Sequence, residues 1–280
     1  MMTKLKIAMC QMEVIDNKEK NLKKAEKMIV ESKSEGADIA ILPEMFICPY
    51  ENDKFIEYYE SQDNSPTLKF ISKIAKKLNI HILAGSIPEI VIDKKGDKKI
   101  YNTSFFFDDE GELLGFHRKL HLFDADIKGK LYFKESDTLS PGDKITVIDS
   151  KLGKIGIAIC FDIRFSELST IMALKGAKIL IFPGVFNLTT GSLHWKLLLQ
   201  SRALDNQVFT VGVSQALNEN QNYPAYGHSL ISNPFGEVII EANSKEELLI
   251  TEIDLDEIVT VREELPVRKN KRNELYQLKF

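Results

Sequence analysis

The segment ADIAIL at residues 37–42 is a short apolar run that predicts a buried β-strand, and similar runs lie on both sides of it, LKIAM at 5–9 and IHILA at 80–84. The residues between these runs place apolar side chains at helical spacing, as over residues 22–29. A Ser-Pro pair at 65–66 predicts the N-cap and first turn of a second helix. Strands that alternate with helices in this way are typical of an α/β domain.

Further along the chain the pattern changes to pairs of strands. Residues 103–107 and 113–117 are apolar runs that flank the turn Asp109-Glu110-Gly111, which predicts a hairpin and therefore a mixed sheet. The runs 145–148 and 155–159 predict a second antiparallel pair. Helices are expected near 167–175 and 194–205, and further strands at 177–182, 208–213, 230–232, 238–240 and 248–253.

No internal repeat and no low-complexity linker interrupts this order. We therefore expect one domain over residues 1–280, with a core over about residues 4–254 and a C-terminal helix and tail at 255–280. The last six residues, LYQLKF, are partly apolar, which suggests that they dock on another surface such as a partner subunit.

Composition and charge narrow the classes of function. A hydrophobic content of 44% and a charged content of 28% are those of an ordinary folded chain, so a disordered protein is excluded. The net charge of −4 gives no positive field for nucleic acid or an anionic membrane, and the basic stretch 268–272 is flanked by glutamates. We expect a small-molecule substrate, with no nucleic-acid partner and no membrane partner.

The cysteines and the N-terminus bear on localisation. Cys10, Cys48 and Cys160 are scattered and odd in number, which favours a reducing compartment over a disulfide framework. The apolar run near the N-terminus is too short for a signal-peptide core, and no run reaches the roughly 18 apolar residues of a membrane-spanning helix. A cytoplasmic location is therefore expected.

Three chemically capable side chains follow buried strands of the predicted sheets, where α/β folds build their sites. Glu44 follows the run 37–42 through a proline, Lys119 follows the second strand of the hairpin, and Cys160 ends the run KIGIAIC. Taken singly, they also suit a surface glutamate, a solvated lysine and a buried inert cysteine. Together they suggest a nucleophilic thiol, and the backbone N–H groups after Cys160 are suited to bind an oxyanion.

Motifs around these residues resemble a known family. LPEMF at 42–46, HRKLHLF at 117–123 and CFDIRF at 160–165 resemble the glutamate, lysine and cysteine motifs of the nitrilase superfamily, as do GSIPE (85–89), YNTS (101–104) and YGHS (226–229). The resemblance covers nearly the whole chain. It narrows to the omega-amidase branch through FDADIKGKLYFKES (123–136), LSPGD (139–143), FPGVFNLTTGSLHW (182–195), SRALDNQVF (201–209) and NPFGEV (233–238).

The resemblance implies a four-layer α-β-β-α sandwich of two mixed sheets, and cysteine-dependent hydrolysis of a carbon–nitrogen bond. Cys160 would attack the amide carbon to form a thioester, while Glu44 would take the thiol proton and pass it to the departing ammonia. Lys119 and the backbone N–H of Phe161 would stabilise the oxyanion. Glu135 matches a second family glutamate that orients the lysine and the substrate, although the residues alone suggest a surface position for it.

The omega-amidase branch hydrolyses the terminal amide of 2-oxo dicarboxylic acid monoamides, chiefly 2-oxoglutaramate and 2-oxosuccinamate. Ile47 and Cys48 stand where the branch commonly has Asn and a small residue, so we expect a changed pocket mouth. The residues alone leave open that Arg164 pairs with Asp162 or with a neighbouring loop, and that the other candidates are turn or capping positions. By family position, the candidate receptors for the substrate's carboxylate and keto oxygens are Tyr50, Arg164, Asn187, Thr189 and Thr190.

Other chemistries find less support in the sequence. None of the five histidines sits in a motif that would pair it with Cys160 as in papain-like enzymes. His117 and His121 are four residues apart, but no pattern for a third zinc ligand accompanies them, which favours polar histidines with satisfied hydrogen bonds on either side of Lys119. No P-loop and no dinucleotide-binding glycine motif is present, so we expect no metal and no cofactor.

Two alternatives to an omega-amidase remain open. One is another amidase of the superfamily, acting on N-carbamoyl amides or on deaminated glutathione, and the other is a non-catalytic binding protein on the same fold. The superfamily pairs subunits through helix layers near the nucleophile motif, so the resemblance also implies a homodimer.

Overall fold

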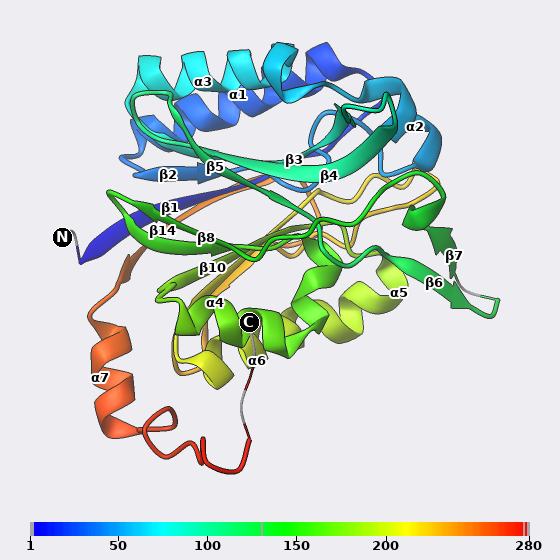
Figure 1. Ribbon diagram of the computed structural model, residues 1–280. Coiled ribbons are helices and arrows are strands. Elements are labelled where there is room, and N and C mark those ends of the chain that lie inside the picture. The colour runs from blue at the N-terminus through cyan, green and yellow to red at the C-terminus, as the bar shows by residue number, and fades with distance from the viewer. Residues whose placement is uncertain (1–2, 130, 277, 279–280) are drawn as a thin grey trace.

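The computed structural model describes residues 3–129, 131–276 and 278. Two six-stranded sheets lie face to face, and helices cover the outer face of each, so that the molecule has four layers in the order α-β-β-α (Figure 1). The fold class implied by the resemblance is therefore confirmed. Within the described residues, no helix is both long and apolar enough to traverse a bilayer.

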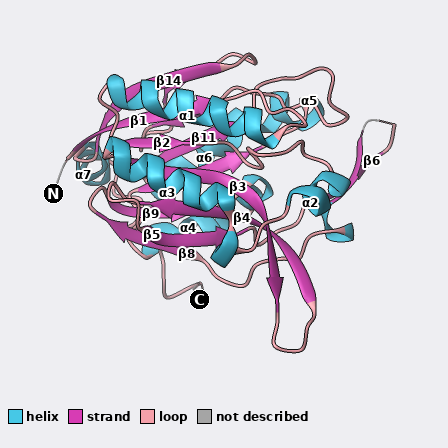
Figure 2. Ribbon diagram, turned by 90° about the horizontal axis from the view of Figure 1, so that it is seen from above, coloured by secondary structure: helices cyan, strands magenta, loops and turns pink. Residues whose placement is uncertain are grey.

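The first sheet contains the N-terminal strands and one strand from the C-terminal part of the chain. β1, β2 and β3 are parallel, whereas β3, β4 and β5 pair as antiparallel neighbours, so the sheet is mixed as predicted. The helices α1 (Lys18–Ser34) and α3 (Pro66–Leu78) lie on its outer face (Figure 2). The strand order is β14 (Glu247–Asp254), β1 (Lys4–Gln11), β2 (Ile39–Ile41), β3 (His81–Ile92), β4 (Lys98–Phe107) and β5 (Leu113–Arg118).

The second sheet repeats this plan with the C-terminal half of the chain. β9, β10 and β11 are parallel, and antiparallel strands flank them on both sides. The helices α4 (Ser166–Leu174) and α6 (Lys196–Asn206) cover the outer face, and α5 (Leu188–Thr190) and a π-helical turn, Gly191–Trp195, precede α6. The strand order is β13 (Val238–Glu241), β12 (Leu230–Ser232), β11 (Phe209–Ser214), β10 (Ile179–Gly184), β9 (Gly153–Ile157) and β8 (Thr146–Ser150).

Local sequence chemistry accounts for the start of α3. The Ser65 hydroxyl accepts a hydrogen bond from the backbone N–H of Leu68, and Pro66 occupies the first turn, as predicted from the Ser-Pro pair. In β1 the side chains alternate between two cores, because Leu5 and Ile7 face the second sheet whereas Ala8 lies in the core beneath the helices. Both faces of the strand are buried, which explains its nearly continuous apolar sequence.

Some elements were not predicted from the sequence. The helix α2 (Asn52–Tyr58) has two turns, and β6 (Asp124–Ile127) and β7 (Leu131–Lys134) form a separate hairpin that projects at the right of Figure 1. The outer ends of β3 and β4 also project from the body of the protein (Figure 2). These segments are partly exposed and contribute few core residues, so their hydrophobic pattern is weak.

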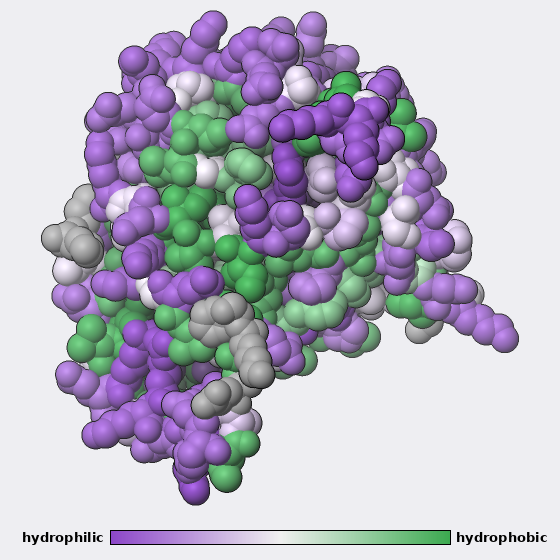
Figure 3. Space-filling view, viewed as in Figure 1, coloured by the Kyte–Doolittle hydropathy of each residue, from purple (hydrophilic) through white to green (hydrophobic). Residues whose placement is uncertain are grey.

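The edge strands β5 and β8 lie on the same side of the sandwich and contact each other. Figure 3 shows hydrophobic side chains gathered on this face. A shallow groove there is lined in part by Phe116, Ile145 and Val147. This surface contains none of the predicted site residues.

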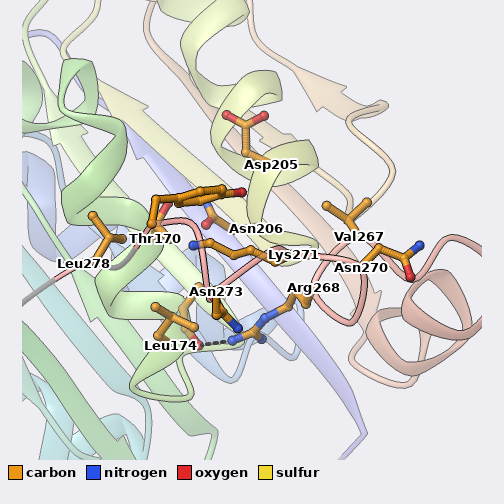
Figure 4. Close-up of a pocket in the computed structure, with 12 residues that line it drawn as sticks. Thr170, Leu174, Asp205, Asn206, Val267, Arg268, Asn270, Lys271, Asn273 and Leu278 are labelled. Atoms are coloured by element: carbon orange, nitrogen blue, oxygen red, sulfur yellow. Dashed lines mark hydrogen bonds between the residues drawn. The ribbon is translucent and has the colours of Figure 1, made fainter.

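The C-terminal segment leaves the first sheet and returns to the helices of the second. The helix α7 (Glu257–Glu264) follows β14, and the chain then turns back toward α4 and α6 (Figure 1). Arg268 Nη2 donates a hydrogen bond of 3.4 Å to the carbonyl oxygen of Ala173. A cavity of about 670 Å³ lies between the tail and these helices, lined among others by Thr170, Asp205 and Lys271 (Figure 4). Tail residues 277, 279 and 280 lie outside the described residues.

Candidate active site

Four predicted catalytic side chains, far apart in the sequence, meet at one end of the sandwich. Glu44 lies in the turn after β2, Lys119 directly after β5, Glu135 directly after β7, and Cys160 three residues beyond β9. The first three are fully buried, and Cys160 is 5% exposed. Hydrogen bonds link Lys119 to both glutamates, and Cys160 lies close enough to Glu44 for the two groups to influence each other's pKa.

The Lys119 ammonium is held between two carboxylates. Its Nζ atom lies 3.0 Å from Glu44 Oε1, 2.9 Å from Glu135 Oε1 and 3.1 Å from the Tyr50 hydroxyl oxygen. Burial alone lowers the pKa of a lysine, but the charges of Glu135 and Glu44 raise the pKa of Lys119 well above its ordinary value. The amine therefore stays positively charged although no water reaches it.

The Glu44 carboxylate is held on both oxygens. Oε1 also accepts a hydrogen bond of 2.7 Å from Asn102 Nδ2, and Oε2 accepts one of 2.7 Å from the backbone N–H of Val185. Gln215 Nε2 donates to the backbone carbonyl oxygen of Glu44 at 2.8 Å, which fixes the turn itself. Burial raises the pKa of Glu44, and the charge of Lys119 opposes this. A carboxylate with a raised pKa is a better acceptor for a thiol proton.

Glu135 supports Lys119 from the other side. Its Oε1 accepts a hydrogen bond of 2.5 Å from the Tyr50 hydroxyl, and its Oε2 accepts one of 2.5 Å from the backbone N–H of Phe123. Glu135 is fully buried, so the surface position suggested by the residues alone is wrong. Tyr50 is 1% exposed and is absent from the residues that line the pocket beside Cys160. Its hydroxyl therefore organises the charged cluster, and its contact with substrate stays a prediction.

Cys160 stands in a tight turn between a strand and a short helix. Its backbone has the left-handed φ of 48°, and it begins the 3₁₀ helix Cys160–Arg164. A non-glycine residue in this conformation is strained, and such strain is typical of functional sites. Burial and the charge of Glu44 raise the pKa of the Cys160 thiol, while Lys119 and the backbone N–H of Val185 oppose the rise. The resting sulfur is therefore a thiol that needs a base.

Asp162 connects the cysteine turn with the lysine segment. Its Oδ2 lies 3.1 Å from His117 Nε2, its Oδ1 lies 2.7 Å from His121 Nδ1, and it accepts a hydrogen bond of 3.0 Å from the backbone N–H of Ile159. The two histidines flank Lys119, two residues away on either side. Burial alone raises the pKa of a carboxyl, but the hydrogen bonds from His117 and His121 lower the pKa of Asp162. This carboxylate thus fixes Lys119 relative to the nucleophile.

The histidine pair considered as a zinc site has another role in the structure. Both rings are engaged by Asp162, and His117 Nδ1 also lies 3.0 Å from the Thr146 hydroxyl. In the described ranges, no group of three His, Cys, Asp or Glu side chains is arranged to hold a metal ion. Nor does the described structure contain an ion pair between Asp162 and Arg164, because the histidines and backbone N–H groups occupy that carboxylate.

A small pocket opens at the sulfur. Its volume is about 10 Å³, roughly the space of one water molecule, so a substrate enters only when lining side chains move. Arg164 is the charged residue in its wall, and its guanidinium lies 5.5 Å and 5.1 Å from the ring centroids of Phe161 and Phe186. The lining residues are Phe123, Cys160, Phe161, Arg164, Val185, Phe186, Thr190 and Tyr223.

The other predicted substrate receptors differ in their positions. Thr190 lines the pocket, whereas Asn187 and Thr189 do not. Asn187 caps α5, because its Oδ1 accepts a hydrogen bond of 2.9 Å from the backbone N–H of Thr190, and its Nδ2 lies 3.2 Å from the Tyr223 hydroxyl oxygen. The capping interpretation left open for Asn187 therefore holds in the structure.

Ile47 and Cys48 do not form the pocket mouth, which corrects the expectation drawn from their departure from the family pattern. Both are fully buried in the core beneath α1 and α3, where Asn21 Nδ2 donates to the Ile47 carbonyl oxygen at 3.0 Å. Burial raises the pKa of the Cys48 thiol, and it raises the pKa of Cys10 to about 12. The turn carries both side chains inward because the core there takes apolar groups.

Sequence reasoning missed several residues of the site. Asn102 and Tyr223 contact its members, and Asp162 supports it by holding His117 and His121, which the sequence predicts only as polar residues with satisfied hydrogen bonds. The segment YNTS at 101–104 was noted for its resemblance, but no role for Asn102 could be read from it. Only the spacing of histidines two residues before and after Lys119 was a usable signal.

Comparisons with known proteins identify the family of the chain. The sequence model described as carbon-nitrogen hydrolase matches residues 6–263. The chain is 41% identical to a human protein named omega-amidase NIT2, over 100% of this chain and 99% of that one. It is 44% identical to the chloroplastic omega-amidase of Arabidopsis thaliana, over 99% of this chain and 75% of that protein.

Solved structures give the same result for the fold. Nit3 of Saccharomyces cerevisiae, described as a member of branch 10 of the nitrilase superfamily, has a TM-score of 0.87 at 41% identity and is matched over 96% of this chain and 97% of that one. The NitFhit protein of C. elegans also has a TM-score of 0.87, at 32% identity over 98% of this chain and 66% of that one. This chain belongs to the carbon-nitrogen hydrolase family and is a hydrolase that acts on carbon–nitrogen bonds.

Proposed function

We propose that this hydrolase is an omega-amidase, which releases ammonia from the terminal amide of a 2-oxo dicarboxylic acid monoamide and leaves the 2-oxo acid. Relatives that bear this name support the proposal, since they are 41–45% identical over nearly the full chain. The observation that carries it is the buried ion pair of Glu44 with the Lys119 ammonium, which lies near the Cys160 thiol. This arrangement supplies a nucleophile, a base and a positive charge to one amide group.

In the first half-reaction, Cys160 Sγ forms a bond to the amide carbon while its proton passes to Glu44. The carbonyl oxygen becomes an oxyanion, and its collapse breaks the carbon–nitrogen bond. Glu44 returns the proton to the nitrogen, which leaves as ammonia, and the acyl group remains on Cys160 as a thioester.

In the second half-reaction, a water molecule takes the place of ammonia. Glu44 accepts one proton from this water, whose oxygen attacks the thioester carbon. The carbon–sulfur bond then breaks, and the proton on Glu44 passes to the Cys160 sulfur. The acid is released and the enzyme returns to its first state.

Two hydrogen-bond donors, one charged and one neutral, stabilise the oxyanion of both half-reactions. Lys119 carries a full charge whose position is fixed by Glu135 and Glu44. Phe161 is the second residue of a 3₁₀ helix, and the N–H groups at a helix start have no acceptors within the helix. Its N–H is therefore free to donate to a carbonyl oxygen bonded at Cys160.

A substrate panel tests the proposed reaction. We expect ammonia from 2-oxoglutaramate and 2-oxosuccinamate, and far less from N-carbamoyl amino acids and from glutamine, measured as initial rates at equal concentrations. A preference for an N-carbamoyl compound would assign the protein to another branch of the superfamily. No ammonia from any member of the panel would favour a non-catalytic binding protein.

Trapping the thioester tests the nucleophile. After rapid acid quenching, mass spectrometry should find the acyl group on the peptide that contains Cys160. Cys160→Ala should lower turnover by several orders of magnitude and remain folded, whereas Cys10→Ala and Cys48→Ala should retain turnover. An acyl group on the Cys48 peptide would show that the nucleophile is assigned wrongly.

We also propose a homodimer and a cytoplasmic location. Exposed leucines on the second helix layer support the dimer, namely Leu174 of α4 and Leu197 and Leu204 of α6, and Val267 and Tyr276 of the tail are exposed beside them. Light scattering after size exclusion tests the dimer, which a monomeric mass would exclude. The cytoplasmic location rests on the unpaired cysteines of the sequence.

A further inference from the structure

The guanidinium of Arg164 lacks an acidic partner in the described structure. Its Nη1 lies 3.2 Å from His194 Nδ1, and its Nε is shielded from water without an acceptor. Burial lowers the pKa of Arg164 in consequence. A cation left in this condition beside the nucleophile is compensated when an anionic ligand enters the pocket.

Arg164 is held so that its charge stays in the pocket wall. Phe161 and Phe186 lie against the guanidinium, with the centroid distances given above. The backbone is fixed as well, since Arg202 Nε donates to the Ile163 carbonyl oxygen at 2.8 Å and Arg202 Nη2 donates to that of Arg164 at 3.0 Å. These contacts restrain the side chain, but none of them orients its N–H groups within the guanidinium plane.

His194 supplies that orientation. A guanidinium is only a donor, so the contact requires His194 Nδ1 to be the acceptor and its proton to sit on Nε2, which makes the ring neutral. Burial and the charge of Arg164 both lower the pKa of His194, in agreement with a neutral ring. The residue lies in the π-helical turn Gly191–Trp195, a type of turn that is frequent at functional sites.

A neutral acceptor has a consequence that a carboxylate would not have. Arg118 of this protein makes two hydrogen bonds to Glu89, of 2.7 Å and 2.8 Å, and its charge is thereby neutralised. His194 fixes Arg164 without neutralising it, so the positive charge remains available to a ligand. The long Arg side chain has already lost its rotamer freedom before binding. The free energy of ligand binding is therefore not reduced by the entropy of ordering this side chain.

We propose that His194 is a positioning residue that presents Arg164 as the receptor for the carboxylate of the substrate. This inference deepens the proposed function and rests on it, because it assigns the recognition of the acid end of a dicarboxylic monoamide to an oriented guanidinium. The amide end lies at Cys160, and the carboxylate accepts hydrogen bonds from the Arg164 N–H groups that His194 leaves unused.

Binding to a variant without turnover tests the proposal. In a Cys160→Ala background, calorimetry with glutaramate, a five-carbon monoamide with one carboxylate, is compared with pentanamide, which lacks the carboxylate. His194→Leu should weaken glutaramate binding about tenfold and leave pentanamide binding unchanged. His194→Asn keeps a neutral acceptor and should retain affinity within about threefold. His194→Asp accepts the hydrogen bond but neutralises Arg164, so it should weaken glutaramate binding at least as much as His194→Leu.

The control is Leu193→Ala, an exposed neighbour in the same turn, which should leave both affinities unchanged. Equal glutaramate affinity in the His194→Leu and parent proteins would overturn the proposal. So would an equal loss for glutaramate and pentanamide, since that result indicates a structural role for the histidine. Ammonia release by the wild type is measured separately, so failure of the omega-amidase reaction and failure of the binding inference give different results.

Discussion

Two groups of charge lie near Cys160, the fully buried Lys119 cluster and the half-buried Arg164, and they differ in how their charges are paired. Lys119 is enclosed by Glu44 and Glu135 and every charge has a partner, whereas Arg164 has aromatic rings and a neutral histidine. The first arrangement is complete without substrate, and it keeps the catalytic groups in place and in the required ionisation states. In the second arrangement the Arg164 guanidinium has no acidic partner, and an anionic ligand would provide one. The comparison teaches that the groups for the chemistry have charged partners within the protein, whereas the group proposed to recognise the substrate has none.

The largest effect is expected when Lys119, the cation that Glu44 and Glu135 share, is removed. Lys119→Met leaves two carboxylates facing each other without compensation. We expect turnover to fall about 10³-fold and the free energy of unfolding to fall by about 3 kcal/mol, measured by initial rates and by urea denaturation. Lys151→Met is the matched control, because that lysine pairs with Asp109 and Glu110 at the surface and should cost less than about 1 kcal/mol. Equal losses for the two variants would show that the buried cluster is not special.

A second prediction concerns Asp162, the carboxylate that links the segment of Lys119 to the turn of Cys160. Asp162→Asn removes the negative acceptor of His117 and His121, so we expect the free energy of unfolding to fall by about 2 kcal/mol and kcat to fall about tenfold. KM should change little, since Asp162 does not line the pocket. The control is Asp63→Asn, an exposed residue of a 3₁₀ helix. A rise in KM with normal kcat would contradict the positioning role.

The pH dependence of the reaction tests the ionisation states of Glu44 and Lys119. Glu44 must be ionised to accept the thiol proton, so kcat/KM should fall as the pH drops through the raised pKa of this group, above the ordinary glutamate range. Lys119 should give no alkaline limb near neutrality, because its pKa is raised. Asn102→Ala removes one donor to the Glu44 carboxylate and should move the acid limb to higher pH. A shift to lower pH would refute this assignment of the base.

The smallest expected effect is on stability, when Arg164 is removed. Arg164→Met removes a half-buried charge that has no acidic partner, so the free energy of unfolding should change by less than about 1 kcal/mol, with either sign. Thermal unfolding of this variant and of Lys119→Met under the same conditions gives the direct comparison. A loss as large as that of Lys119→Met would mean that Arg164 has a structural role after all.

Particular elements show what could be predicted from the sequence. The buried strands and the hairpin at 103–117 were recognised because their apolar periodicity is strong, and α2 and the β6–β7 hairpin were missed because they are short and partly exposed. Glu44, Lys119 and Cys160 stood out because they follow buried strands. Glu135 looked like a surface residue, since nothing in its neighbours along the chain reveals that the hairpin before it returns to the core.

The sequence by itself determined most of the strands and helices, the order of the three catalytic motifs and the family, because these depend on local periodicity and on residue types. Only the tertiary structure decided which charges are paired. It enclosed Lys119 between Glu44 and Glu135, which lie 75 and 16 residues away in the chain, and brought His194 from 30 residues away to Arg164. The physical reason is that the pKa of a buried group and the partner of a charge depend on distances in space, and the chain sets these only when its sheets have packed.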